Sequence, residues 1–277
     1  MLDAMTGAPT NPRLRREPPR FRIVSLVRRE PITPRLVRCT FGGSDLDGFP
    51  EPDPAASVRV LFPQPGTTEL VMPEWNGNEF LLPGSDGTTR LRPYLRTFTP
   101  RATRSDPPEL DVDVVMHGTG VASPWVTNAE IGAPTAVSGP GRGYAISSDA
   151  PPHLLAGDES AIPAMSQLLE VLPETTAVVV HVEIDDPAAR HALPDHPRAE
   201  VHWHERPPGA PSGDTLVTAV ETATIDDATR VWAAGEAAAM QRIRRHLFET
   251  RGIPRPRTTI RGYWKFGRAG AGDDDER

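Results

Sequence analysis

The sequence predicts two domains, an antiparallel β-barrel followed by a doubly wound α/β layer. Its 277 residues are long for one compact domain and sufficient for two. The first half consists of short β runs cut by glycine and by many of the 32 prolines, which argues against a helical bundle. Beyond about residue 150, apolar strand patterns alternate with helical ones, as in a parallel sheet covered by helices. We expect the join near residues 143–152.

The β half is expected to follow a disordered arm at residues 1–20, which is rich in arginine and proline. Short apolar runs bounded by glycine or proline lie at residues 21–28, 36–41, 57–62, 91–98 and 110–116. Runs of this length and spacing are typical of an antiparallel barrel or sandwich. The first domain is therefore predicted to span residues 21–143.

The second half alternates between strand patterns and helix patterns. Strands are predicted at residues 153–156, 177–184, 199–205, 230–234 and 258–264, and helices at 160–172, 215–223 and 236–251. The run 177–184 is β-branched and apolar on both faces, as a buried parallel strand would be. We predict a second domain over residues 153–267 and a disordered acidic tail over 268–277.

Composition narrows the classes of function. The formal net charge of −7 argues against nucleic acid as a main partner. The single cysteine, Cys39, excludes an internal disulfide and disfavours thiolate-ligated zinc and iron–sulfur clusters. No stretch approaches the roughly 20 apolar residues of a membrane span, and the N-terminus lacks the apolar region of a secretory signal. We therefore expect a cytoplasmic protein without an integral membrane segment.

The stretch Arg96-Thr97-Phe98-Thr99 ends a β run and carries groups suited to a nucleotide cofactor. Arg96 and Phe98 alternate and therefore share one face of the strand. An arginine suits a phosphate, and a flat ring can lie against an isoalloxazine. The alternative is an ordinary strand with an exposed arginine and a buried phenylalanine.

Two glycine turns precede predicted helices. The first, at residues 117–120, leads to a short helix that Ser123 could cap with Pro124 at its first position, and free N–H groups there would suit a pyrophosphate. The second, at residues 157–159, joins a strand to a helix as in dinucleotide folds, although a full G-x-G-x-x-G is missing. Each turn could instead be purely structural.

Two further stretches are ambiguous. Residues 138–143 could form a domain linker or a loop against a cofactor. His202 and His204 alternate on one strand face and could ligate a metal, but no third ligand is evident nearby, which favours a solvent-facing strand and no metal site. Neither G-x-S-x-G nor H-E-x-x-H occurs, so hydrolase chemistry has no support.

Taken together and in this order, these stretches closely resemble the siderophore-interacting proteins, a branch of the ferredoxin–NADP reductase-like flavoproteins. The resemblance runs from about Arg22 to Arg268, through residues 37–43, 96–101, 117–125, 155–164, 232–236 and 262–265. It implies a Greek-key β-barrel that binds FAD and a Rossmann-like α/β domain that binds NADH or NADPH. Phe98 departs from the family, where tyrosine is usual, and lacks the phenol hydroxyl that would hydrogen-bond to FAD.

The resemblance also implies roles for individual residues. Arg96 would contact an FAD phosphate, Phe98 would pack on the flavin, and Thr99 would lie near its reactive edge. The implied FAD-binding set is Arg96, Thr97, Phe98, Thr99, His117, Ala122, Ser123 and Trp125. The implied nicotinamide-side set is Gly157, Asp158, Glu159, Gly235 and Glu236. Trp264, Lys265 and Arg268 are expected to border the substrate, and no side-chain acid or base is implied.

The implied activity is reduction of ferric siderophores by NAD(P)H through FAD, with release of Fe(II), in a monomeric protein. Two alternatives remain open, a flavin or ferric-chelate reductase of the same fold and a ferric-siderophore carrier that has lost FAD. The run at 177–184 ends with Glu183 and Ile184 and is followed by Asp185 and Asp186, while Arg190 and Arg206 are cations that could swing in toward a phosphate. An acid at such a strand end suits a ribose 2′-hydroxyl and repels a 2′-phosphate, which favours NADH.

Overall fold

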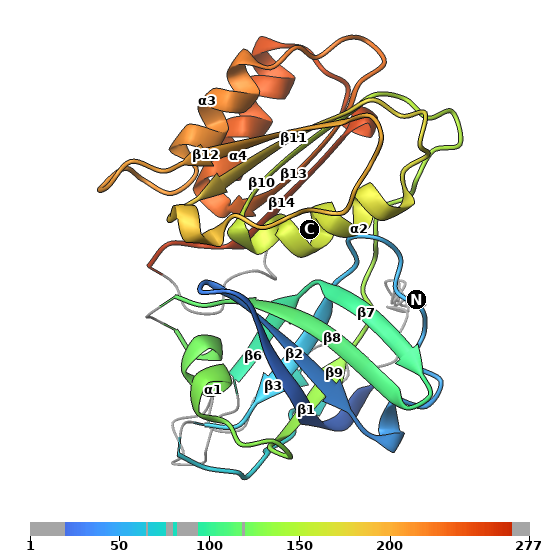
Figure 1. Ribbon diagram of the computed structural model, residues 1–277, viewed down its shortest axis with the longest axis vertical. Coiled ribbons are helices and arrows are strands. Elements are labelled where there is room, and N and C mark those ends of the chain that lie inside the picture. The colour runs from blue at the N-terminus through green and yellow to red at the C-terminus, as the bar shows by residue number, and fades with distance from the viewer. Residues whose placement is uncertain (1–19, 65, 76–79, 82–93, 118–119, 268–277) are drawn as a thin grey trace, which may run out of the picture.

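The computed structural model describes residues 20–64, 66–75, 80–81, 94–117 and 120–267. These residues form an antiparallel sheet and a parallel sheet, one below the other in Figure 1. The predicted tail lies outside the described residues, as does the predicted arm apart from Arg20, whose guanidinium pairs with Asp45. None of the helices in the described part is long and apolar enough to cross a membrane.

The antiparallel sheet has seven strands in the order β6-β3-β9-β1-β2-β8-β7. Their bounds are β1 Phe21–Thr33, β2 Leu36–Gly42, β3 Val58–Phe62, β6 Tyr94–Phe98, β7 Pro100–Ser105, β8 Pro108–Val115 and β9 Pro134–Ser138. The edge strands β6 and β7 are consecutive in the chain and meet at Thr99, so the sheet curls into a half-barrel. Two further strands, β4 Glu74–Trp75 and β5 Phe80–Leu81, pair separately.

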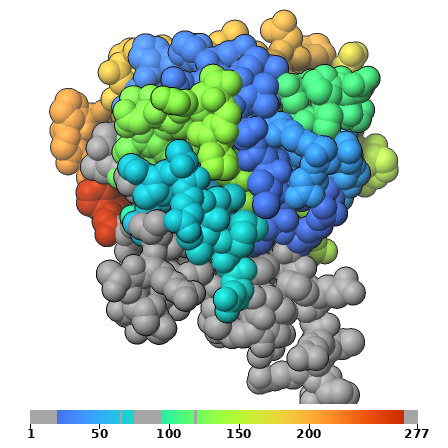
Figure 2. Space-filling view, turned by 90° about the horizontal axis from the view of Figure 1, so that it is seen from below, coloured from blue at the N-terminus to red at the C-terminus, as the bar shows by residue number. Residues whose placement is uncertain are grey.

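The core of this half-barrel follows from the two-residue period of its strands. On β8, Leu110, Val112 and Val114 point inward to the apolar core. The intervening acids on the outer face are covered by arginines, as in the pair of Arg38 with Asp113. Helix α1 (Ala122–Asn128) adds apolar side chains to the same core. Its C-terminal carbonyls accept from Arg29, and Figure 2 shows this segment beside β1 on the lower face of the molecule.

Strands β7 and β9 were missing from the sequence-based assignment. Both begin with a proline, Pro100 and Pro134, which signals a turn or a strand end when it is read along the chain. Proline is tolerated at the first residue of a strand, where its missing N–H breaks little of the ladder. Strand β9 nevertheless lies between β3 and β1 near the middle of the sheet, because pairing on both sides outweighs this local signal.

The parallel sheet has the order β12-β11-β10-β13-β14. Its strands are β10 His153–Asp158, β11 Val178–Ile184, β12 Ala199–Glu205, β13 Arg230–Glu236 and β14 Thr258–Trp264. Helix α2 (Ile162–Val171) packs on one face, and α3 (Asp214–Thr222) and α4 (Ala237–Arg245) pack on the other. The predicted helix at 236–251 is shorter as an α-helix, because its last part, His246–Thr250, is a π-helical turn. All five predicted strands are present, and the order reverses between β10 and β13.

Polar contacts join the two sheets. The Gln167 side chain on α2 accepts from the Ala55 N–H at 3.0 Å and donates to the Pro100 carbonyl at 2.6 Å. Arg261 on β14 donates to carbonyls of residues 55, 142 and 143. The stretch 138–143 is part of this junction, since its backbone lies against Ser57, to whose carbonyl Gly141 donates at 2.7 Å. It therefore serves at least as a packed connection between the sheets.

Candidate functional site

The carboxyl ends of β10 and β13 form the switch point of the parallel sheet, where ligands bind in folds of this kind. Asp158 ends β10, and its carboxylate accepts from the Ser160 N–H and hydroxyl at 2.9 and 2.5 Å. It also accepts from the Glu236 N–H at 2.9 Å and the Trp264 indole N–H at 2.8 Å. Burial raises the pKa of Asp158 to about 6, although these donors act in the opposite direction. Gly235 allows this approach, because a Cβ there would lie 2.6 Å from the carboxylate.

Glu236 holds a second set of contacts at this edge. One carboxylate oxygen caps α4 by accepting from the Ala239 N–H at 2.9 Å, and the other accepts from the Phe266 N–H at 3.2 Å. Asp158 and Glu236 together therefore anchor the segment that follows β14. Both carboxylates are buried and accept hydrogen bonds from protein donors. Their role in this geometry is to fix the backbone around the residues predicted to border the nicotinamide dinucleotide.

The neighbouring strand ends carry a chain of ion pairs. Glu159, next to Asp158, accepts from Arg35 Nε at 2.8 Å and from the Asp185 N–H at 2.8 Å. Asp185, just after β11, pairs with Arg206 at 2.7 Å and with Arg35 at 3.2 Å. The Arg206 guanidinium, followed by that of Arg35, lowers the pKa of Asp185. Sequence reasoning did not single out Arg35, because nothing in the chain pattern links residue 35 to residues 159 and 185.

Glu183 is not available to a ribose. Its side chain is 2% exposed and accepts from the N–H groups of Gly213 and Leu216 and from the Thr215 hydroxyl, at the start of α3. A carboxylate in this place satisfies the free donors of a helix N-terminus. Of the three acids expected to favour NADH, Asp185 and Asp186 lie at the exposed edge.

On the half-barrel, Arg96 lies on β6 and Thr99 forms the corner between β6 and β7. The Arg96 guanidinium lies 5.8 Å from the Tyr94 ring and donates to the Leu95 carbonyl at 2.7 Å. Burial lowers the pKa of Arg96, and no carboxylate among the described residues forms an ion pair with it. A half-buried cation of this kind fits a phosphate. Thr97 is exposed.

The next two residues of this stretch face inward. Phe98 is half-buried and meets the Phe62 ring edge-on at 6.1 Å. Thr99 is buried and lies beside Tyr263 of β14. This contact crosses from the half-barrel to the parallel sheet, one residue from Trp264. The flavin stretch and the nicotinamide-side edge predicted from sequence are therefore neighbours in space.

The predicted pyrophosphate turn differs in detail. Helix α1 starts at Ala122 after Val121, so Ser123 lies inside the helix and does not cap it, which corrects the predicted cap. Its buried hydroxyl instead accepts from the His117 N–H at 3.1 Å and donates to the Val115 carbonyl at 3.2 Å. Ser123 thus holds the exposed His117 turn against β8. Residues 118–119 lie outside the described part.

Trp125 is a core residue in this structure. Its ring lies 4.9 Å from the Phe62 ring and 6.3 Å from the Phe41 ring, and the residue is 9% exposed. Packing in the core of the half-barrel is therefore sufficient to explain a tryptophan at this position. Ala122, at the start of the helix, is half-buried. A hydrophobic side chain on a short helix does not reveal from sequence alone whether it faces the core or a ligand.

The predicted substrate residues separate into two groups. The Trp264 indole is half-buried and donates its N–H to Asp158, so this donor is committed to the protein and not to a substrate. Lys265 is exposed at the end of β14, and Phe266 beside it is 79% exposed. Arg268 lies outside the described residues.

His202 and His204 have a partner that the sequence did not show. His181 on β11 stacks on His202 with ring centroids 5.0 Å apart, and its Nδ1 lies 2.9 Å from Nε2 of His204. Burial, followed by the nearby imidazoles, lowers the pKa of His181 to about 4. Among the residues with described positions, no group of three or more His, Cys, Asp or Glu is arranged to hold a metal ion.

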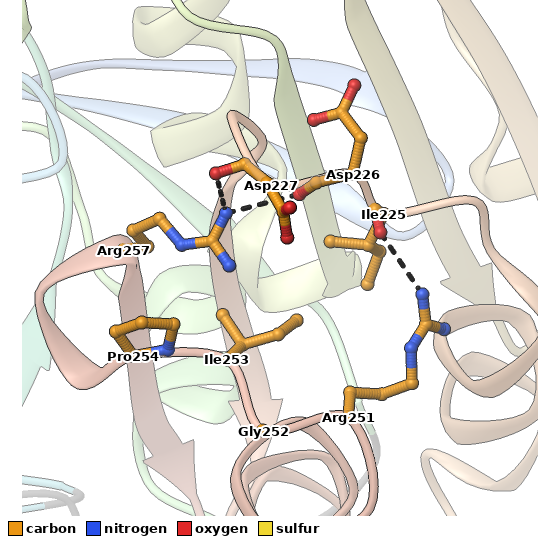
Figure 3. Close-up of a pocket in the computed structure, with 8 residues that line it drawn as sticks. All are labelled: Ile225, Asp226, Asp227, Arg251, Gly252, Ile253, Pro254 and Arg257. Carbon is orange, nitrogen blue, oxygen red and sulfur yellow. Dashed lines mark hydrogen bonds between the residues drawn. The ribbon is translucent and has the colours of Figure 1, made fainter.

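A pocket of about 470 Å³ lies away from this edge, at the amino ends of β13 and β14 (Figure 3). Arg251 and Arg257 line it, but both donate to backbone carbonyls, including those of Ile225 at 3.2 Å and Asp226 at 3.1 Å. The two arginines therefore stabilise the loop that lines the pocket, and the pocket is separate from the candidate site.

Comparison with known proteins agrees with this architecture. Residues 25–144 match the siderophore-interacting FAD-binding domain, and residues 150–267 match the siderophore-interacting protein family. Ferric vibriobactin reductase ViuB of Vibrio cholerae serotype O1 is 29% identical over 260 residues, covering 92% of this chain and 93% of that protein. A siderophore utilization protein from T. fusca is 33% identical with a TM-score of 0.80, covering 92% of this chain and 96% of its own.

A more distant structure shares the fold alone. The ferredoxin reductase in carbazole 1,9a-dioxygenase is 14% identical with a TM-score of 0.62, over 89% of this chain and 69% of its own. The two-domain fold predicted from sequence is thus confirmed, as is the family that the motifs indicated. The chain belongs to the siderophore-interacting protein family.

Proposed function

We propose that this protein is an FAD-dependent reductase that uses NAD(P)H to reduce ferric siderophores. The observation that carries the proposal is the close approach of the corner at Thr99 to the parallel-sheet domain, where the Pro100 carbonyl accepts from Gln167 of α2 at 2.6 Å and Thr99 lies beside Tyr263 of β14. It brings the stretch expected to hold the flavin next to the switch point of the parallel sheet, where a nicotinamide dinucleotide would bind. Transfer between two cofactors requires such a junction, and a simple carrier does not.

The residues present fit FAD. Arg96 offers a partly desolvated guanidinium, and His117 stands on an exposed turn tied to β8 through Ser123. When bound, FAD would supply the redox chemistry, accepting two electrons from NAD(P)H and passing them singly to Fe(III). The protein's part is to hold the two cofactors at one edge and to leave a path for the siderophore beside Lys265.

A colour test separates this proposal from its rivals. A yellow preparation that NADH or NADPH bleaches would exclude a carrier without FAD. Re-oxidation of the reduced protein by ferric siderophores, faster than by free flavin or simple ferric chelates, would separate a siderophore reductase from a general flavin reductase of the same fold. A colourless protein that cannot be loaded with FAD would contradict the proposal.

NADH is expected to be used at least as well as NADPH. Asp185 lies at the end of β11 and would repel a 2′-phosphate, while its ion pair occupies Arg206. Asp185→Ser should raise kcat/KM for NADPH relative to NADH, because Arg206 would be free to meet a phosphate. Asp186→Ser is the matched control, because it removes the neighbouring acid, which accepts from the Ala188 N–H at 2.8 Å, and leaves the pair of Asp185 with Arg206 in place. A parent protein with clearly higher kcat/KM for NADPH would contradict the expectation.

Lys265→Glu should slow reduction of an anionic ferric siderophore and leave flavin reduction by NAD(P)H nearly unchanged. Reversing one charge about 8 Å from a unit anion in water costs roughly 1 kcal/mol, or about fivefold at low salt. Raising the ionic strength should shrink the effect, because exposed charges are screened.

Arg245→Glu provides the control for this charge reversal, because this exposed arginine lies on α4. Equal losses in both half-reactions of Lys265→Glu, or equal effects of the two variants, would show that Lys265 is not a substrate contact.

A further inference from the structure

We propose that Arg35 is the positioning residue for the nicotinamide half-reaction. Its side chain extends from the half-barrel and would fix the position of the carboxyl edge of the parallel sheet relative to the half-barrel. It would also balance the acids at this edge, so that a nicotinamide dinucleotide can bind. This inference rests on the proposed reductase function.

The backbone of Arg35 is fixed at the turn between β1 and β2. Its N–H donates to the Thr33 hydroxyl at 3.1 Å, and its carbonyl accepts from the Met116 N–H at 2.7 Å. Figure 1 shows this turn at the end of the half-barrel that faces the parallel sheet. The side chain therefore starts from a rigid point of the flavin domain.

The guanidinium reaches two neighbouring strand ends of the other domain. Nε lies 2.8 and 3.0 Å from the two carboxylate oxygens of Glu159, and Nη2 lies 3.2 Å from Asp185. Glu159 is buried and also accepts from the Asp185 N–H. One arginine thus ties the ends of β10 and β11 to each other and to the half-barrel. Charge-assisted bonds of this kind fix orientation as well as distance.

The position of Arg35 connects both predicted cofactor regions. Met116, its backbone partner, directly precedes His117 of the predicted FAD turn. Glu159, its side-chain partner, belongs to the predicted nicotinamide-side turn. Misplacing reacting groups by about 1 Å can cost on the order of a hundredfold in rate. A link between the two turns is therefore well placed to set the approach of the nicotinamide.

Arg35 also changes the charge of this edge. Glu159 and Asp185 are two acids in contact, and Arg35 and Arg206 are their cations. Without Arg35, the three remaining side chains would carry a net charge of −1. A dinucleotide carries an anionic diphosphate, so its binding would be opposed by repulsion that salt screens.

A second ion pair between the domains offers a matched control. Arg101 on β7 pairs with Glu170 on α2 at 2.5 Å, joining the same two domains away from the strand ends. Removing it deletes the same kind of bond without touching Glu159 or Asp185. Any effect that comes only from loosening the domains should appear in Arg101→Ala as well.

The test compares Arg35→Ala, Arg35→Lys and Arg101→Ala as FAD-loaded full-length proteins. Anaerobic stopped-flow reduction by NADH should show the ratio of reduction rate to Kd lowered at least tenfold in Arg35→Ala. Added salt should recover part of the loss by improving Kd. Arg35→Lys should recover part of it at every salt concentration, because the charge remains. FAD affinity and re-oxidation by a ferric siderophore should match the parent.

Other outcomes overturn the inference in distinguishable ways. Equal effects of Arg35→Ala and Arg101→Ala would reduce Arg35 to a structural contact. Loss of FAD from Arg35→Ala would place the residue in the flavin site instead. If neither NADH nor NADPH reduces the parent protein, the proposed function fails, and the role of Arg35 fails with it.

Discussion

Replacing Gly157 with alanine should lower the free energy of unfolding by about 2–3 kcal/mol, in the upper range for overpacked sites. A Cβ at Gly157 would lie 2.4 Å from the Ala161 Cβ and 3.0 Å from the Ala234 carbonyl oxygen. Neither atom can swing aside, because one is the first atom of a side chain and the other is backbone. The strained contacts lie at the end of β10, where the chain leads into α2 and where β10 pairs with β13. Urea unfolding of the two proteins, compared at constant m-value, would measure it.

A double variant tests this cause. Ala161→Gly removes the nearest atom and by itself should cost about 0.5–1 kcal/mol, as glycine does in place of alanine. The combination of Gly157→Ala with Ala161→Gly should then be more stable than the sum of the single effects predicts, by at least about 1 kcal/mol. Strict additivity would show that the Ala161 methyl is not the source of the strain.

Arg96→Ala should weaken FAD binding by roughly tenfold or more, since a lost charge-assisted hydrogen bond costs about 1.5–3 kcal/mol. Arg96 is half-buried beside Tyr94, and burial already lowers its pKa. An ion pair with an anionic phosphate would offset this desolvation cost, so removal of the guanidinium should raise the Kd for FAD. Titration of the FAD-free protein with FAD, followed by flavin fluorescence, would measure the change.

Arg28→Ala is the matched control for this experiment. Arg28 is also an arginine of the half-barrel, but it pairs with Glu109 at 2.8 Å on the outer face. Its loss should leave the FAD affinity as in the parent. If Arg96→Ala also retains FAD as tightly as the parent, Arg96 is only a strand residue with a half-buried side chain.

Local patterns were sufficient for the class of fold because they are set by nearest neighbours. A two-residue period cut by turns predicted the antiparallel half, and buried β-branched runs such as Val178–Ile184 predicted the parallel one. The strands that begin with Pro100 and Pro134 were missed, because each proline signals a turn or a strand end; β7 is formed by its hairpin with β8, and β9 by pairing with the distant strands β1 and β3. The order of the six matching stretches indicated the family, because several matches in one order are far more specific than any single one.

The directions of individual side chains were beyond the sequence. Trp125 and Trp264 both stand in motifs, yet one enters the apolar core and the other donates to Asp158. Glu183 and Asp185 are two residues apart, but one caps α3 and the other stays at the exposed edge. These outcomes depend on which helix end or strand packs nearby, and that information is held in long-range contacts.

The sequence by itself therefore determined the two-domain architecture and the family, and it predicted the stretches that would carry FAD and nicotinamide. Only the tertiary structure decided that Thr99 meets Tyr263 and that Arg35 spans Glu159 and Asp185. The physical reason is that local periodicity fixes backbone form over a few residues, while a hydrogen bond requires atoms about 3 Å apart. Residues 35 and 159 reach that distance only after both sheets have formed and docked.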